Sequence, residues 1–453
     1  MLSHDVVGRQ MAGPGIRYYH LARVLSQEFE VRLAAPDEVR ASVPDQGFRV
    51  VQYTRRKWAS VAPWVNWAEI VLFPSDIASD FPQLSEADAF LVVDGYDPLL
   101  AEWLALNPSQ IPQEQDARWR QRMRDLGQQY LMGDFFLCAS ERQRDWWLGA
   151  LEANGRINPY TFGDDPSLRH LIDVVPFGLP RKRPVSSDGL LSGIWPGIAP
   201  EDKVVLWGGG LWPWLDPLTA IRAIAQIWEE RQDVRLIFPG TKHPNPWMRA
   251  IPTHNEEARQ MARRLGLAGK GVFFGEWIPY GEWANVLLES DVALALHYDT
   301  LETRLAFRSR MLDYIWAELP IVATRGDATS DLVEAYHLGT VVDFEDVDGV
   351  AEAILGLLEL SQDALHEQFA EARETLTWEH AAQPLVEFCR HPRRAPDKVA
   401  MGDDLGAPFY VGERKRLIEE GDRWRQLVRK YEEGRFMRAM RWLDRVARRL
   451  RRL

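Results

Sequence analysis

Only two cysteines, Cys138 and Cys389, occur in the 453-residue sequence, which is too few for a disulfide framework. They show no metal-ligand spacing, so we interpret both as reduced core residues of a cytoplasmic protein. Long apolar runs are also absent, because no stretch approaches the roughly 18 apolar residues that a membrane span requires. The N-terminus, MLSHDVVGRQ, lacks the basic and then apolar pattern of a secretion signal. The sequence therefore predicts a protein that is neither secreted nor threaded through a membrane.

A surplus of positive charge is missing as well. The net charge is −12, which argues against a general nucleic-acid-binding protein. Apolar residues make up 46% of the chain and charged residues 26%, as in ordinary soluble globular proteins. At 453 residues the chain is too long for one hydrophobic core and suits two domains.

Short apolar runs alternate with segments of helix length through most of the chain, which is typical of doubly wound parallel sheets. We place a first α/β domain at residues 1–180, where a segment with proline and glycine forms a hinge. A second α/β domain occupies residues 181–392 and begins with a linker rich in Pro, Ser and Gly. Residues 393–453 are interpreted as a linker and a helical tail.

Glycines follow the first predicted strand of each domain. The first loop contains Gly13 and Gly15, and the second contains Gly208, Gly209 and Gly210. Glycines between a strand and a helix let backbone N–H groups approach a ligand closely. The second loop is a phosphate cradle in outline, although it lacks the Walker lysine. For the first loop, a plain connection is an equally good interpretation.

Another helix start lies in the first domain, after an apolar run at residues 135–139. Ser140 is a good N-cap residue, and Gln143 follows three residues later. This spacing predicts a capping box, in which the two side chains satisfy the first free N–H groups of the helix. Capping alone accounts for both residues.

The most informative stretch runs from Asp291 to Asp327. It reads as a strand, a polar loop, a helix and a second strand, and the helix is indicated by apolar residues at helical spacing, Phe307, Met311, Leu312 and Ile315. Loops at the carboxyl ends of parallel strands bind ligands, and a helix that starts in an arginine-rich loop directs its N–H groups at an anion. The stretch therefore predicts a phosphorylated ligand. The competing interpretation is that Arg304, Arg308 and Arg310 form a solvated helix face.

This stretch resembles the nucleotide-sugar site of retaining glycosyltransferases of the GT-B fold, family four. Phe307 and Asp313 keep the spacing of the family's Phe and second Glu, and Leu319–Val322 keeps the strand that follows. Leu305 stands at the position of the family's first Glu. Glu302 lies three residues earlier, where a locally longer loop would deliver a carboxylate to the sugar.

Other positions depart from the family pattern. Arg308 and Glu318 stand where the family usually has glycine. Gly210 and Leu215 occupy the positions of an Arg and a Lys that hold the donor diphosphate in the family. We expect arginines at the start of the helix to replace them, because a guanidinium binds phosphate through two parallel hydrogen bonds.

The resemblance implies two facing Rossmann-like domains, with the donor on the second, the acceptor on the first and a final helix, 378–391, that crosses back. It implies sugar transfer from a nucleotide-diphosphate sugar to a hydroxyl of a glycan or lipid-linked acceptor, with retention and without a metal ion or cofactor. Asp313 would hold the ribose, Arg308 the diphosphate and Glu302 the sugar. The further expected donor-side residues are Gly208, Gly209, Gly210, Lys242, Trp277, Phe307 and Arg310, and the acceptor-side residues are Gly13, Gly15, Arg17 and Asp97.

Two other functions fit parts of the pattern. A non-catalytic GT-B protein that acts as a partner or regulator in polysaccharide assembly would explain why the usual Arg, Lys and first Glu are missing. A sugar-nucleotide epimerase shares the fold, but it requires acidic and histidine residues that we do not place in this sequence.

The C-terminal segment 435–453 holds eight arginines and one aspartate. Apolar residues recur in it every three or four positions, at Phe436, Met440, Leu443, Ala447 and Leu450. A basic amphipathic helix of this kind is typical of a segment that lies on an anionic membrane surface. The alternative is a helix that packs on its own protein or on a second copy.

Overall fold

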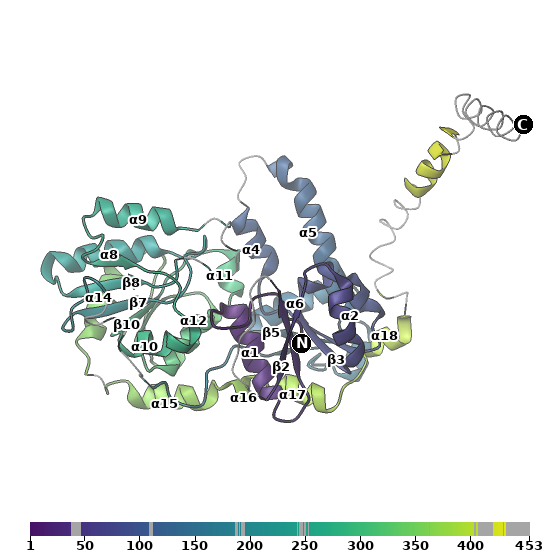
Figure 1. Cartoon of the computed structure of the whole chain (residues 1–453), viewed down its shortest axis with the longest axis horizontal. Helices are drawn as coiled ribbons and strands as arrows, with labels where there is room; N and C mark the ends of the chain where they lie inside the picture. Colours follow the sequence, from purple (N-terminus) through teal and green to yellow (C-terminus); the bar gives the residue numbers. More distant parts are fainter. Residues whose placement is uncertain are drawn as a thin grey trace, which may run out of the picture.

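The computed structural model describes the chain apart from residues 38–46, 108–111, 186–188, 190, 192–194, 242, 244–247, 249–250, 252, 362, 403–404, 406–419, 429 and 432–453. Two α/β domains lie side by side, and helices near the C-terminus run beneath both (Figure 1). Each ladder between named strands is parallel. Parallel strands need crossover connections, which explains the alternation of strands and helices along the chain.

The sheet strands of the first domain are β1 Arg32–Pro36, β2 Arg49–Tyr53, β3 Ile70–Pro74, β4 Phe90–Asp94, β5 Phe135–Cys138 and β6 Ile172–Val174. They form a β1–β2 pair and a sheet of order β3-β4-β5-β6. The first three residues join the two parts, because Leu2 N donates to Leu72 O at 2.8 Å and Ser3 N donates to Ala34 O at 2.8 Å. The loop that follows Ser3 therefore starts at the carboxyl edge of this combined sheet.

The helices of the first domain are α1 Gly13–Leu25, α2 Trp58–Trp67, α3 Ile77–Asp80, η1 Pro82–Glu86, α4 Leu99–Leu106, α5 Pro112–Met132, α6 Glu141–Ala153 and α7 Pro159–Asp164. The start of α1 contains the predicted glycine loop. Its apolar side chains, with Tyr18 and Leu21 fully buried, pack into the core that links both domains.

The strands of the second domain are β7 Lys203–Trp207, β8 Val234–Phe238, β9 Val272–Phe274, β10 Val292–Ala295, β11 Ile321–Thr324 and β12 Gly339–Val342. Their order is β12-β11-β10-β7-β8-β9. The direction of winding therefore reverses between β7 and β10. In an open parallel sheet this reversal opens a crevice at the carboxyl ends of the strands, where ligands bind.

The helices of the second domain are α8 Pro217–Glu230, α9 Asn255–Arg264, η3 Tyr280–Glu282, α10 Trp283–Leu288, α11 Leu301–Leu305, α12 Ser309–Trp316, α13 Ala328–Ala335, α14 Val347–Leu358 and α15 His366–Thr375. The helix predicted after β10 is split into α11 and α12, with Phe307 and Arg308 between them. The predicted apolar face of α12 is confirmed, because Met311, Leu312 and Ile315 are buried.

Glu318 follows α12 with a φ of 58°, in the left-handed region that favours glycine. This conformation explains why a glycine is usual at the matching family position. Here the carboxylate lies 2.8 Å from both His366 and Arg373 of α15, and 3.2 Å from Arg183 of the interdomain segment. These contacts offset the backbone strain by fastening α15 and the linker to α12.

The chain returns to the first domain through α16 Trp378–Ala381, α17 Gln383–Arg390 and α18 Pro396–Met401. Phe388 of α17 stacks on Phe135 of β5, with ring centroids 4.8 Å apart, so the chain packs against the first domain here through two short helices where a single helix, 378–391, was expected. Asp397 of α18 pairs with Arg156 at 2.6 Å, and both side chains are fully buried. A linker was expected to begin at residue 393. The structure instead places α18, residues 396–401, in the first domain, so that boundary was wrong.

The tail segment 435–453 lies outside the described residues. Among the helices that the structure describes, none is long and apolar enough to cross a membrane.

Candidate functional site

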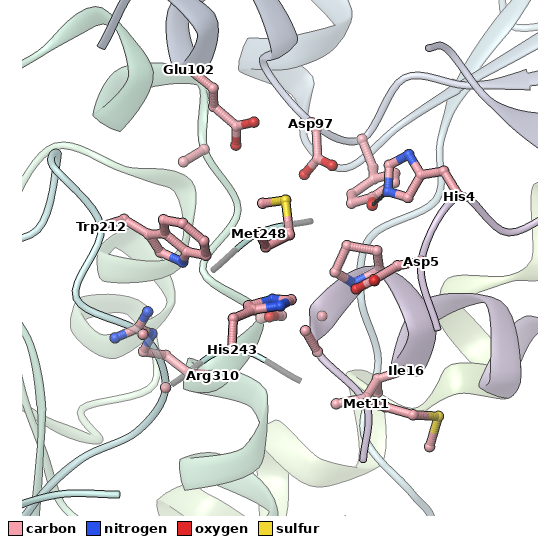
Figure 2. A pocket seen from close by; sticks show the side chains of 18 of the residues that line it. His4, Asp5, Met11, Ile16, Asp97, Glu102, Trp212, His243, Met248 and Arg310 are labelled. Atoms are coloured by element: carbon pink, nitrogen blue, oxygen red, sulfur yellow. Dashed lines mark hydrogen bonds between the residues drawn. The ribbon is translucent and has the colours of Figure 1, made fainter. Parts of the chain in front are cut away.

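A cleft of about 770 Å³ lies between the two domains, at the crevice where the winding of the second sheet reverses. Both domains contribute side chains to it. Figure 2 shows that these side chains point toward a shared space, and those it labels include His4, Asp97 and Glu102 from the first domain and Trp212, His243, Met248 and Arg310 from the second.

The glycine loop after β7 forms one wall of the cleft, as predicted for Gly208, Gly209 and Gly210. The N–H of Gly208 donates to the Tyr314 hydroxyl at 2.8 Å, and a Cβ there would lie 2.7 Å from that oxygen. Gly209 has a φ of 101°, which strains any residue with a Cβ. Only glycine therefore lets the backbone run this close to α12.

Arg310 lies beside this loop, and its Nη2 would be 3.4 Å from a Cβ at Gly209. Its Nη1 is buried without a hydrogen-bond partner, and no described carboxylate forms an ion pair with it. Burial lowers the pKa of this guanidinium. A cation without an ion-pair partner, beside a glycine loop that lines the cleft, can bind an anion such as a diphosphate, which offers the hydrogen bond that Nη1 of Arg310 lacks.

Arg308 and Glu302 are paired with each other. The guanidinium donates to both carboxylate oxygens, at 2.9 and 2.7 Å, and both side chains are buried. Arg308 Nε also lies 3.4 Å from Asp327, which lies 3.3 Å from His297. Burial alone would lower the pKa of Arg308, but Glu302 and Asp327 raise it further than burial lowers it. Arg308 was expected to hold the diphosphate and Glu302 the sugar. The structure bonds these two side chains to each other, so the Arg308 guanidinium is committed to Glu302 and is not free for a diphosphate.

Other expected donor residues lie around this pair. Asp313 lines the cleft and accepts a hydrogen bond from Trp283 Nε1 at 3.1 Å. Phe307 stacks on Phe177 of the hinge, with ring centroids 6.1 Å apart, so it joins the two domains. Trp277 lines the cleft beside His243. Lys242 lies outside the described residues.

Asp313 should make folding stability depend on pH. Burial raises its pKa to about 7, although the indole of Trp283 opposes this shift. Between about pH 4 and pH 7 the folded carboxyl keeps a proton that the unfolded one has lost, so its contribution to stability falls as pH rises. The variant Asp313→Asn should gain stability relative to the wild type when pH is raised from 5 to 8. Urea unfolding measures this difference, and an equal difference at both pH values would contradict it.

On the first domain, Asp97 faces the cleft as predicted, and burial raises its pKa to about 7. The sequence analysis missed His4, Asp76 and Glu102, which also line it. His4 Nδ1 lies 2.7 Å from Asp76, and this carboxylate raises the pKa of His4 to about 9 although burial lowers it. Burial and neighbouring carboxylates raise the pKa of Glu102. Asp76 follows β3, and a polar residue after a strand end is a signal that was available. His4 follows only the isolated bridge of Leu2 with Ala34.

Arg17 corrects the prediction for the acceptor side. Its side chain is 0% exposed and does not reach the cleft. It donates to both oxygens of Asp94 at 2.8 Å and to the carbonyls of Val175 and Pro176 at 2.9 and 3.1 Å. Arg17 is therefore a core residue that fastens α1 to β4 and to the hinge.

The two glycines of the first loop have different positions. Gly13 lines the cleft, where a Cβ would lie 3.3 Å from the Ser309 hydroxyl. At Gly15 a Cβ would lie 2.2 Å from the carbonyl oxygen of Val6, so this glycine allows close packing rather than contact with a ligand. The expected role of Gly15 in an acceptor site is therefore wrong.

No group of three or more His, Cys, Asp or Glu residues in the described part of the chain is placed to hold a metal ion. An Asp-x-Asp triplet occurs at 346–348, but its first residue caps α14 by accepting from Gly349 N at 2.9 Å. This triplet does not line the cleft.

Comparison with known proteins agrees with this geometry. Residues 202–360 match the family model for glycosyl transferases group 1. This region is therefore similar in sequence to the glycosyl transferases group 1. It contains the glycine loop, Arg310 and Asp313, which line the cleft on the side of the second domain. No curated protein matches the sequence.

Solved structures show the fold of most of the chain. WaaG, a glycosyltransferase involved in lipopolysaccharide biosynthesis, shares 15% identity at a TM-score of 0.59, over 87% of this chain and all of that one (100%). Anabaena HepE in complex with UDP and glucose shares 16% sequence identity at a TM-score of 0.59, and the match covers 86% of this chain and 100% of HepE. Sucrose-phosphate synthase from Thermosynechococcus elongatus shares 15% sequence identity at a TM-score of 0.61, and the match covers 86% of this chain and 97% of the synthase. The predicted GT-B fold is confirmed.

Proposed function

We propose that this chain is a retaining, metal-independent glycosyltransferase that moves a sugar from a nucleotide-diphosphate sugar to a hydroxyl of a glycan or lipid-linked acceptor. The observation that carries the proposal is Arg310, a half-buried side chain beside the glycine loop at the crevice of the second sheet, whose buried Nη1 has no hydrogen-bond partner. HepE structures hold UDP and UDP-glucose, which supports a nucleotide-sugar donor here.

The donor site follows from charges and free hydrogen-bond donors. Departure of the nucleotide diphosphate places negative charge on its oxygens, and Arg310 with the backbone of the glycine loop would stabilise that charge. Asp313 lies three residues after Arg310 on α12 and would accept hydrogen bonds from the ribose. Glu302 and Arg308 would then face the sugar as a rigid pair, with the carboxylate directed at its hydroxyls.

The acceptor would approach from the first domain. Asp97, Glu102 and the pair of His4 with Asp76 line that wall. Apolar side chains such as Met11 and Leu99 line the cleft between these polar groups. A cleft of this kind excludes water from a reactive sugar and leaves one hydroxyl in position to attack.

The proposal predicts turnover that persists in a chelator and keeps the anomeric configuration of the donor. Nucleotide-sugar donors are incubated with the protein in EDTA, and the product anomer is read by NMR. The variant Glu302→Gln should lower turnover at least tenfold and leave nucleotide affinity nearly unchanged, because its contact is with the sugar. Glu334→Gln, on the exposed face of α13, serves as the matched control.

Inversion of configuration, or activity that returns only with a divalent ion, would contradict the proposal. The non-catalytic alternative predicts nucleotide binding without turnover of any donor. The closed Glu302–Arg308 pair is the structural feature that favours this second function.

A cytoplasmic location, with the basic segment 435–453 on an anionic membrane surface, is part of the same proposal. Each basic residue near such a surface contributes about 1 kcal/mol, so eight arginines would outweigh repulsion from an acidic body. The full chain should sediment with anionic liposomes, and a chain that ends near residue 430 should not. Equal sedimentation of the two chains would contradict the membrane role.

A further inference from the structure

Gln143 connects the two domains at the back of the cleft. Its side chain is 2% exposed, and its amide nitrogen donates to the carbonyls of Tyr96 and Leu305, each at 2.7 Å. Its amide oxygen accepts from the N–H of Ala139 at 2.6 Å. The predicted capping box is therefore only half formed, because Ser140 caps α6 while the Gln143 side chain is used elsewhere.

The two carbonyls belong to opposite walls of the cleft. Tyr96 comes directly before Asp97, which faces the acceptor side. Leu305 ends α11, which carries Glu302, and it lies three residues before Arg308. One amide group thus fixes the backbone on the acceptor side and the backbone that positions the buried ion pair.

We propose that Gln143 is a positioning residue that couples the acceptor wall to the Glu302–Arg308 pair, so that the two sides of the reaction centre form only together. The inference rests on the proposed function. No residue of α6 was expected in the site. Under this proposal α6 contributes to assembling the site through Gln143.

The chemistry of the contact requires glutamine. A primary amide offers two N–H donors and one acceptor from one group, and all three are used here. Glutamate has the same size but no donor, and it would direct an oxygen at two carbonyl oxygens. Methionine has a similar volume and would leave both buried carbonyls without a donor and the N–H of Ala139 without its acceptor.

A neighbouring contact supplies the control. Arg142, the residue before Gln143, also crosses between the domains, to Asp331 at 2.6 Å and to the carbonyl of Gly326 at 2.8 Å. Its side chain is 42% exposed and that of Asp331 is 52% exposed. An exposed ion pair of this kind contributes little to stability. Arg142→Ala therefore removes an interdomain contact without touching the α11–α12 segment.

The test compares Gln143→Glu, Gln143→Met and Arg142→Ala with the wild type in the full chain. Hydrogen exchange of the segment 303–308 reports the contact directly, because local order there depends on it. Both Gln143 variants should exchange this segment at least tenfold faster, and Arg142→Ala should match the wild type. Gln143→Met carries no charge, so it decides the question if Gln143→Glu does not fold.

The second readout is catalytic. Nucleoside diphosphate binding, measured by calorimetry with UDP, GDP and ADP, should stay within about twofold in the Gln143 variants, because that site lies within the second domain. Turnover should fall at least tenfold. Unchanged exchange, or faster exchange with unchanged turnover, would overturn the inference. Failure of the proposed function shows instead as a wild type that binds no nucleotide, and the exchange measurement then still tests the contact.

Discussion

Replacing Arg310 with alanine should weaken nucleoside diphosphate binding by about 10- to 100-fold. Hydrogen bonds to a charged group contribute about 1.5–3 kcal/mol, and each 1.4 kcal/mol is a factor of ten in affinity. Arg310 is half-buried beside the glycine loop and its Nη1 has no hydrogen-bond partner, so its contacts with a diphosphate would replace no existing ion pair among the described residues. Calorimetric titration of the variant and the wild type gives the ratio of dissociation constants.

Two other arginines of the same stretch are the controls. Arg304→Ala should leave affinity unchanged, because this side chain is exposed on α11. Arg308→Ala should lower turnover more than affinity, because its guanidinium is committed to Glu302. Equal dissociation constants for Arg310→Ala and the wild type would show that the diphosphate lies elsewhere.

Arg17→Ala should destabilise the protein by about 3–5 kcal/mol, since it leaves the fully buried Asp94 without its cation. The same change frees the carbonyls of Val175 and Pro176 at the hinge. Denaturant unfolding of the first domain measures the loss.

A double variant separates this core role from an acceptor role. Arg17→Met with Asp94→Leu removes both charges and fills the space with apolar groups, and it should recover most of the stability. If Arg17→Ala kept wild-type stability and lost only sugar transfer, the core assignment would be wrong.

Local patterns in the sequence predicted the features that depend on residues close together in the chain, such as strands, helix faces and the glycine loop. The apolar run before Gly208 is β7, and the spacing of Met311, Leu312 and Ile315 is the buried face of α12. The glycine loop and Asp313 face the cleft because strand ends and helix starts fix their direction once the sheet forms.

Contacts between distant residues were not predictable from the same patterns. Arg17 is turned into the core by Asp94, which is 77 residues away. Gln143 fits a local capping pattern, yet its side chain bonds to Leu305, 162 residues away. Arg308 and Arg310 are two residues apart, yet Arg308 is paired with Glu302 and Arg310 has an unpartnered Nη1. Such pairings are set by how elements pack, which helix and strand periods do not encode.

The central claim is that the cleft beside Gly208–Gly210 binds a nucleoside diphosphate. Titration of the wild-type chain with UDP, GDP and ADP by calorimetry tests it most directly. The account predicts that at least one of them binds with one site per chain and that Arg310→Ala weakens this binding by about 10- to 100-fold. Absence of binding by all three, or binding that Arg310→Ala leaves unchanged, would contradict it.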